Sequence, residues 1–318
     1  PELARRTTNE PSFLGSTVLH WATRYLTADA ATYVPLDDGL ALVLGSVRDN
    51  LDARLLLTGD FLYHPDHRLG LNASTEDNLA FKAAEDRGGH FWTSLHAERP
   101  QWSSSSFSET AGLLTTRSWA QTNYLAGTNR RAVKAALETF LCRPIPTWMV
   151  PHQTTAWIRR DIDRAPGGDA RVFQESCRHC HSALDGMSGA FASLDFRQAR
   201  FLEERGVLPK FLQHAEVYPE GYVTHDRSWQ NPLALTAHAG GASFGWRGTS
   251  HNQGQGQGVH AFGQMLAASQ GFSACLVKRV FSSVCFEDRD LADPVIRRIA
   301  TEFEQQDQYR LKDLFIRT

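Results

Sequence analysis

Two cysteines and a histidine stand close together near the middle of the chain, in the stretch 176–181 (SCRHCH). A Cys-x-x-Cys-His spacing is the attachment signature of a c-type haem, because both thiols bond to the haem vinyl groups and the adjacent histidine ligates the iron. With five cysteines and thirteen histidines in 318 residues, composition alone gives about 0.003 such matches by chance. The motif therefore predicts one covalent haem c, held by Cys177, Cys180 and His181.

The same residues allow two other chemistries. A Cys-x-x-Cys pair also serves as a thiol redox motif, but such motifs accompany βαβ patterns and none surrounds this one. A structural zinc site needs four ligands. Cys177, Cys180 and His179 or His181 supply three, so a distant histidine would have to supply the fourth. Haem is the favoured interpretation, and the zinc site and the thiol pair are its alternatives.

The sequence indicates the sixth ligand of the iron less clearly than it indicates the attachment residues. Cytochromes c normally use a Met or a His there, and a His/Met pair raises the reduction potential. Met187 follows His181 by six residues, which span at most about 20 Å when extended and must pass around the macrocycle. Met265 lies farther along, on a predicted helix, and is the first candidate, although it also fits an apolar core stripe. Four histidines are the other candidates: His225, His238, His251 and His260.

Two arginines upstream of the motif are suited to the haem propionates, because guanidinium groups bind carboxylates in a bidentate manner. They are Arg160 and Arg164. The alternative is that these arginines pair with Asp161 and Asp163, which lie between them in the sequence.

Local signals predict the elements that position the motif. Asp169 is expected to cap a helix that runs through Cys177 and His181. Small residues in 184–191 (LDGMSGAF) predict a close approach of the backbone, either to the flat macrocycle or within an ordinary turn. The segment 128–142 is predicted as a helix with one apolar stripe, and its basic cluster (Arg130, Arg131 and Lys134) is placed on the solvated face.

Helical periodicity continues through most of the chain. The further predicted helices are 17–26, 39–57, 110–124, 197–213, 259–284, 291–303 and 309–315. Residues 70–108 and 214–258 are predicted as long irregular segments, and no run of alternating strands appears. The expected fold is mainly α, with a cytochrome-c-like haem-binding helical core and long irregular loops. We expect an N-terminal helical region, 1–110, and a haem-bearing domain, 111–318, packed together.

Composition narrows the function classes. The chain is 42% hydrophobic and 21% charged, with a net charge of −2, which argues against a nucleic-acid partner held by bulk charge. No stretch approaches the roughly 18 apolar residues of a membrane span. Haem attachment of this kind takes place outside the cytoplasm, so a periplasmic or extracellular protein is expected.

An exported protein also permits a disulfide. Cys275 and Cys285 would lie about 15 Å apart on one helix, which is too far for a bond between them. We therefore expect Cys142 to pair with one or the other. Buried free thiols are the alternative.

From Ala111 onward, several blocks of the chain resemble a known family. The blocks are 111–117 (AGLLTTR), 126–133 (AGTNRRAV), the segment around Cys142, 160–169 (RDIDRAPGGD), the haem motif with its glycine tail, 244–248 (FGWRG) and 264–285. They are similar to the cytochrome-c-linked domains of unknown function in exported proteins of planctomycete and proteobacterial type. The resemblance implies an exported, haem-bearing, mainly helical protein and carries over no activity. Many family members have further cytochrome modules, whereas this chain has one haem motif.

Three functions are compatible with one covalent haem. Electron transfer to a redox partner protein needs a haem held in a rigid helical shell. A peroxidase-like enzyme needs an open distal position with a polar group, such as Arg247 or His251. A haem-stapled structural or accessory subunit of a membrane-associated assembly would use the aromatic residues of 214–258 to contact other subunits. Electron transfer is the favoured function.

Overall fold

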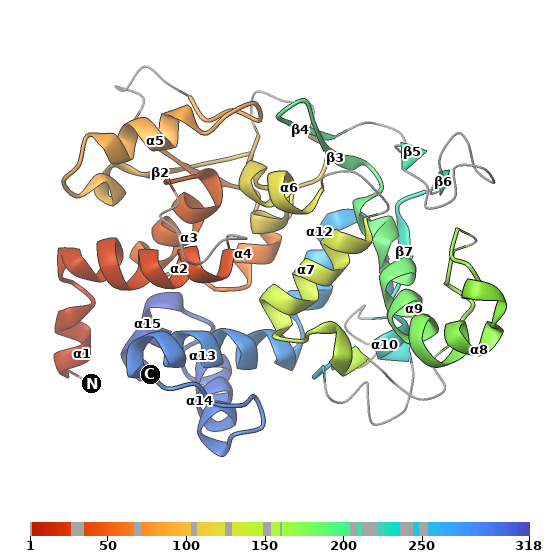
Figure 1. Cartoon of the computed structure of the whole chain (residues 1–318). Coiled ribbons are helices and arrows are strands. Elements are labelled where there is room, and N and C mark those ends of the chain that lie inside the picture. The colour runs from red at the N-terminus through yellow and green to blue at the C-terminus, as the bar shows by residue number, and fades with distance from the viewer. Residues whose placement is uncertain are drawn as a thin grey trace. The chain divides into compact units, whose positions relative to one another are not determined.

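The computed structural model describes residues 2–26, 35–66, 72–102, 107–124, 129–148, 154–159, 161–203, 209–210, 222–223, 226–235, 244–247 and 254–318. These residues are mostly helical, which confirms the prediction of a mainly α protein (Figure 1). The chain divides into two compact units, one comprising residues 1–122, 199–201 and 272–318, the other 123–198 and 202–271. This division differs from the expected boundary near residue 110.

The first unit combines both ends of the chain. Its helices are α1 (Glu2–Thr7), α2 (Leu19–Leu26), α3 (Asp38–Arg48), α4 (Leu55–Thr58), α5 (Leu79–Asp86), α6 (Arg117–Asn123), most of α13 (Gln270–Cys285), α14 (Pro294–Gln305) and α15 (Leu311–Arg317). A π-helical turn, Phe13–Val18, precedes α2, and β1 (Leu62–His64) pairs antiparallel with β2 (His96–Glu98). The segment 70–108, expected to be irregular, therefore holds a helix and a strand.

Aromatic packing explains why the C-terminal helices belong to the first unit. The ring of Phe315 on α15 meets Phe13 and Trp21 edge to face, with centroids 5.3 and 5.5 Å apart. The Leu311 N–H donates to the carbonyl of Leu51 at 3.1 Å. These contacts join segments that are far apart in the sequence, so helical periodicity did not reveal them.

The predicted helix 39–57 is two helices, α3 and α4. Asn50 has φ of +49° and ends α3. The Asn50 N–H donates to Val47 O and the Leu51 N–H donates to Ser46 O, which is the Schellman pattern of a helix C-terminus. Asparagine accepts this left-handed conformation more readily than most residues.

Two adjacent carboxylates organise the start of α3. Asp37 caps α3 itself by accepting the Leu40 N–H at 2.8 Å. Asp38 is fully buried and accepts the backbone N–H groups of Arg117 and Ser118, at 2.5 and 3.0 Å, so that it caps α6. Burial and the neighbouring Asp38 carboxylate raise the pKa of Asp37 to about 7.

The second unit contains the Cys-x-x-Cys-His motif. Its helices are α7 (Arg130–Leu141), α8 (Ala170–Val172), α9 (Arg178–Met187), α10 (Pro232–Leu235) and α12 (Gly258–Ala267). Its short strands include β7 (Ser228–Gln230), paired antiparallel with β8 (Gln255–Gln257), and β5 (Pro209–Lys210), paired with β6 (Tyr222–Val223). Phe262 on α12 is fully buried, and the centre of its ring lies 5.1 Å from that of Phe191 and 5.8 Å from that of Trp229.

One predicted helix, 197–213, is wrong over its described part. The residues form a hairpin of β3 (Leu194–Arg197) and β4 (Arg200–Glu203). The two residues between the strands, Gln198 and Ala199, have φ of +51° and +62°. Two consecutive left-handed residues turn the chain back on itself and cannot continue a right-handed helix.

The cysteines follow one of the two pairings expected for Cys142. Cys142 and Cys275 are disulfide-bonded, whereas Cys285 is an exposed free thiol. Separately, none of the helices in the described part of the chain combines the length and the apolar character needed to cross a membrane.

The raised pKa of Asp37 predicts a pH-dependent stability. The folded state binds this proton more tightly than the unfolded state, whose pKa is near 3.8, so stability is lost as the pH rises from about 4 to about 7. Asp37→Asn keeps a good N-cap and removes this loss. Chemical denaturation gives the free energy of unfolding of the variant and of the parent at each pH. The difference between them should favour the variant more at pH 8 than at pH 5. Asp86→Asn, at an exposed position of α5, is the control, and a constant difference between Asp37→Asn and the parent at both pH values would contradict the assignment.

Candidate functional site

The motif lies on one continuous helical run. The Asp169 carboxylate accepts the Arg171 N–H at 2.9 Å, which confirms the predicted cap. From there α8 continues through a π-helical segment, Phe173–Cys177, directly into α9. Cys180 and His181 therefore follow Cys177 by three and four residues along the helical run. This spacing places the three side chains on one face.

Apolar residues surround the first cysteine. Ile158, Ile162 and Phe173 form a small buried cluster, and Cys177 packs against it. Both Cys177 and Cys180 are half-buried free thiols, and burial together with the nearby Cys177 raises the pKa of Cys180. The face thus combines an apolar surface with two unoxidised thiols that remain partly accessible.

His181 faces a buried carboxylate one helical turn further on. Its Nδ1 is buried, lies 3.5 Å from Oδ1 of Asp185 and makes no hydrogen bond. The Asp185 side chain is fully buried and that of His181 is 24% exposed. Because Nδ1 itself is buried, the exposed part of the ring is made up of its other atoms. This geometry leaves Nε2 as the ring nitrogen that can bind a metal.

A buried cluster of charges holds Asp185 in place. Arg130 on α7 donates from Nε to Asp185 Oδ1, and from Nη1 and Nη2 to the two oxygens of Asp161 at 3.0 and 2.7 Å. The other Asp185 oxygen accepts the Arg159 N–H at 2.9 Å. We call Arg130, Asp161 and Asp185 the buried charge cluster. It links α7, the segment 158–164 and α9, and α7 and α9 lie side by side (Figure 1).

The pKa values follow from these contacts. Burial raises the pKa of Asp185, but the His181 ring, Arg130 and the Arg159 N–H outweigh burial and keep it below its usual value. Burial lowers the pKa of Arg130, and its hydrogen bonds to Asp161 and Asp185 more than reverse that effect. One guanidinium between two carboxylates leaves the cluster with one net negative charge.

The placement of Arg130 corrects the prediction of a solvated basic face. Only 12% of the Arg130 side chain is exposed. By contrast, Arg131 is exposed, and Lys134 forms an exposed ion pair with Glu138 on the same helix. Arg130 lies three and seven residues before Val133 and Leu137, so it extends their apolar stripe toward the start of α7. That register was a usable sequence signal.

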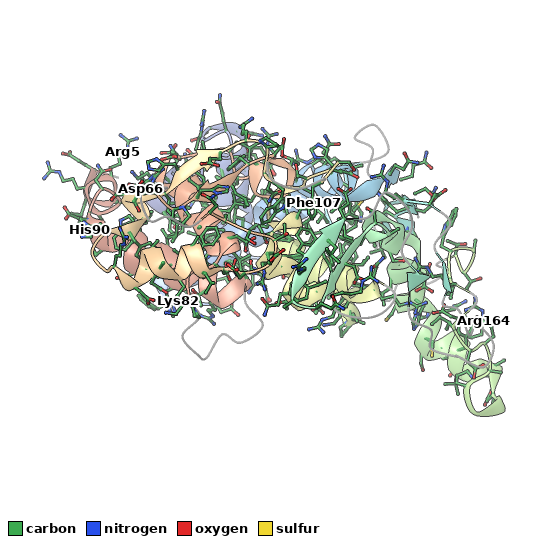
Figure 2. The ribbon with its side chains drawn as sticks, turned by 90° about the horizontal axis from the view of Figure 1, so that it is seen from above. Arg5, Asp66, Lys82, His90, Phe107 and Arg164 are labelled. Atoms are coloured by element: carbon green, nitrogen blue, oxygen red, sulfur yellow. The ribbon has the colours of Figure 1, made fainter. Side chains whose placement is uncertain are left out.

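The structure describes one of the two arginines that were predicted to bind the haem propionates. Arg160 lies outside the described residues. Arg164 donates from Nη2 to the carbonyls of Ile158 and Arg159, at 3.0 and 3.4 Å, and its guanidinium lies 4.7 Å from the centre of the Phe173 ring. Figure 2 labels Arg164 beside the ribbon that leads into α8. It therefore lies beside the motif but holds backbone carbonyls instead of pairing with Asp161, whose partner is Arg130.

The candidates for the distal ligand have different surroundings. Met265 is buried, and its sulfur accepts a hydrogen bond from Asn231 Nδ2 at 3.2 Å. Met187 is fully buried at the end of α9. His260 Nε2 lies 3.1 Å from Gln264 Nε2 on the surface of α12. The other three histidines, His225, His238 and His251, lie outside the described residues.

The small residues after the motif pack against protein backbone. A Cβ on Gly189 would lie 1.9 Å from the carbonyl oxygen of Ser228, and a Cβ on Gly186 would lie 2.9 Å from that of Gln230. Both oxygens belong to β7. The glycines therefore allow β7 to approach the end of α9, and this close contact accounts for them without a macrocycle.

Removing Arg130 tests the buried charge cluster. Arg130→Ala would leave two buried carboxylates without their cation, and breaking a buried pair in this way costs about 3–5 kcal/mol. Arg131→Ala, one residue along α7 and exposed, should change stability by no more than about 0.5 kcal/mol. Urea denaturation of both variants gives the comparison. Equal, small losses for the two variants would show that Arg130 is not held as described.

Comparisons of the chain with protein-family models, with curated proteins and with solved structures find no match. Within the described ranges, no group of three or more His, Cys, Asp or Glu side chains is arranged to hold a metal ion. The chemistry of the site therefore has to be inferred from its own geometry, which consists of two free thiols and one imidazole on a single helical face, backed by the buried charge cluster.

Proposed function

We propose that the chain is an exported mono-haem c-type cytochrome-like protein that transfers electrons through a covalently attached haem. The observation that carries this proposal is the arrangement of Cys177, Cys180 and His181 on one helical face, with both thiols free and Nδ1 of His181 turned toward Asp185. Two thioether links and one axial nitrogen from a single helical turn are the requirements of c-type attachment.

The surroundings of the motif fit the group. The cluster of Ile158, Ile162 and Phe173 offers apolar surface beside Cys177, as a macrocycle requires. Trp157 and Val172, which flank this cluster in sequence, are 40% and 43% exposed, so further apolar surface is open to a ligand. When bound, the haem would supply a one-electron Fe(III)/Fe(II) couple, and the chain would supply attachment, orientation and a defined electrostatic environment.

The chain's own residues also support rapid electron exchange. The buried charge cluster and the close contact with β7 hold in place the helix α9, whose His181 would bind the iron. A rigid axial ligand keeps the rearrangement between oxidation states small, as an electron carrier requires. We propose a redox partner protein outside the cytoplasm, since covalent attachment takes place there.

The attachment itself can be tested by mass. Expressed with a haem-attachment system, the full chain should gain the mass of one haem and keep it after denaturation. Cys177→Ser combined with Cys180→Ser should abolish this gain. Cys285→Ser removes a free thiol outside the motif and is the matched control, which should load normally. A parent chain that gains no mass would rule the proposal out.

Spectroscopy of the loaded protein separates the proposed function from its alternatives. A low-spin spectrum and reversible one-electron reduction are expected for an electron carrier. A high-spin spectrum that changes with peroxide or carbon monoxide would indicate the peroxidase-like enzyme instead. A haem that resists reduction would indicate the haem-stapled structural subunit.

A further inference from the structure

We propose that Asp185 is the positioning residue of the axial histidine, and that its charge strengthens His181 as a ligand and lowers the reduction potential of the haem. This inference rests on the proposed function. It concerns a residue that the Cys-x-x-Cys-His motif does not contain.

The first step is the orientation of the imidazole. His181 and Asp185 are four residues apart on α9, and Asp185 Oδ1 lies 3.5 Å from Nδ1, which is buried without a hydrogen-bond partner. An acceptor at this place favours the tautomer with the proton on Nδ1, which leaves the lone pair on Nε2. The ligating nitrogen is therefore selected before any metal binds.

The second step is the fixation of the carboxylate. Asp185 cannot turn away from His181 without losing the hydrogen bonds from Arg130 Nε and the Arg159 N–H. Both partners are themselves buried or nearly so. In a buried position these charge-assisted hydrogen bonds are expensive to break. The Asp185 carboxylate is thus a fixed acceptor whose position is defined by three segments of the chain.

The third step is electrostatic. Metal-ligating histidines commonly donate their second N–H to a carboxylate, which orients the ring and raises its basicity as a ligand. A stronger donor and a net negative charge on the buried cluster both favour Fe(III) over Fe(II), and so lower the potential. Asp161 carries the same charge but meets Arg130 instead of the imidazole, so its contribution should be only electrostatic.

Nitrogen NMR of the histidines in the full chain, produced without haem, tests the orientation. We expect His181 in the Nδ1–H form in the parent and in Asp161→Asn, and a shift toward the Nε2–H form in Asp185→Ala. The parent spectrum alone decides the matter if the variant does not fold. A parent His181 in the Nε2–H form would overturn the proposal.

Redox titration of the haem-loaded protein tests whether the charge of Asp185 lowers the reduction potential of the haem. Asp185→Asn should shift the reduction equilibrium at least tenfold toward Fe(II), which is about 59 mV for one electron. Asp161→Asn, the matched loss of charge, should give a smaller shift. Equal shifts, or none for Asp185→Asn, would refute a special role for Asp185. If the parent binds no haem, the proposed function fails, and the tautomer of His181 still decides whether Asp185 positions the ring.

Discussion

The second unit depends on a guanidinium buried between two carboxylates. Arg130 uses its three nitrogen donors on Asp161 and Asp185, and so ties α7, the segment 158–164 and α9 to one another. Removing these charges from water costs several kcal/mol per ion, and their mutual attraction often does no more than offset that cost. We therefore expect the buried charge cluster to contribute more to conformational specificity than to the net free energy of unfolding. It permits one rotation of α9 about its axis, and that rotation decides where Cys177, Cys180 and His181 point.

Two of the contacts that hold α9 act on different residues of its C-terminal part. On one side the carboxylate of Asp185 meets Arg130, and on the other Gly186 and Gly189 lie against the backbone of β7. A larger residue at Gly189 would collide with Ser228 O, so the strand and the helix end approach as closely as the backbone allows. The motif residues take no part in either contact. They stay half-buried on the remaining face, which is where a ligand can reach them.

Local signals predicted the motif helix, its Asp169 cap and the mainly α fold, because each depends on residues a few positions apart. The errors arose where distant segments decide the outcome. Arg130 was assigned to solvent because Asp161 and Asp185 lie 31 and 55 residues away, although its place on the apolar stripe of α7 indicated burial. The segment 197–213 has helix-forming residues, yet Gln198 and Ala199 adopt positive φ in a hairpin. The glycines near α9 were compatible with a macrocycle or a turn, and only the position of β7 shows what they contact.

In the proposed haem protein, the second residue that binds the iron would decide how strongly the charge of Asp185 affects the reduction potential. A distal methionine raises the potential, in opposition to a carboxylate behind the proximal imidazole. Met265 would have to give up the hydrogen bond from Asn231 to bind iron, a loss of about 0.5–1.5 kcal/mol in addition to moving a buried side chain. A distal histidine would not raise the potential in this way, but His260, the one candidate histidine that the structure describes, would have to give up its contact with Gln264 Nε2. If a haem is attached as proposed, the net negative charge of the buried charge cluster would favour Fe(III) and so a low potential, at which the haem donates electrons more readily than it accepts them.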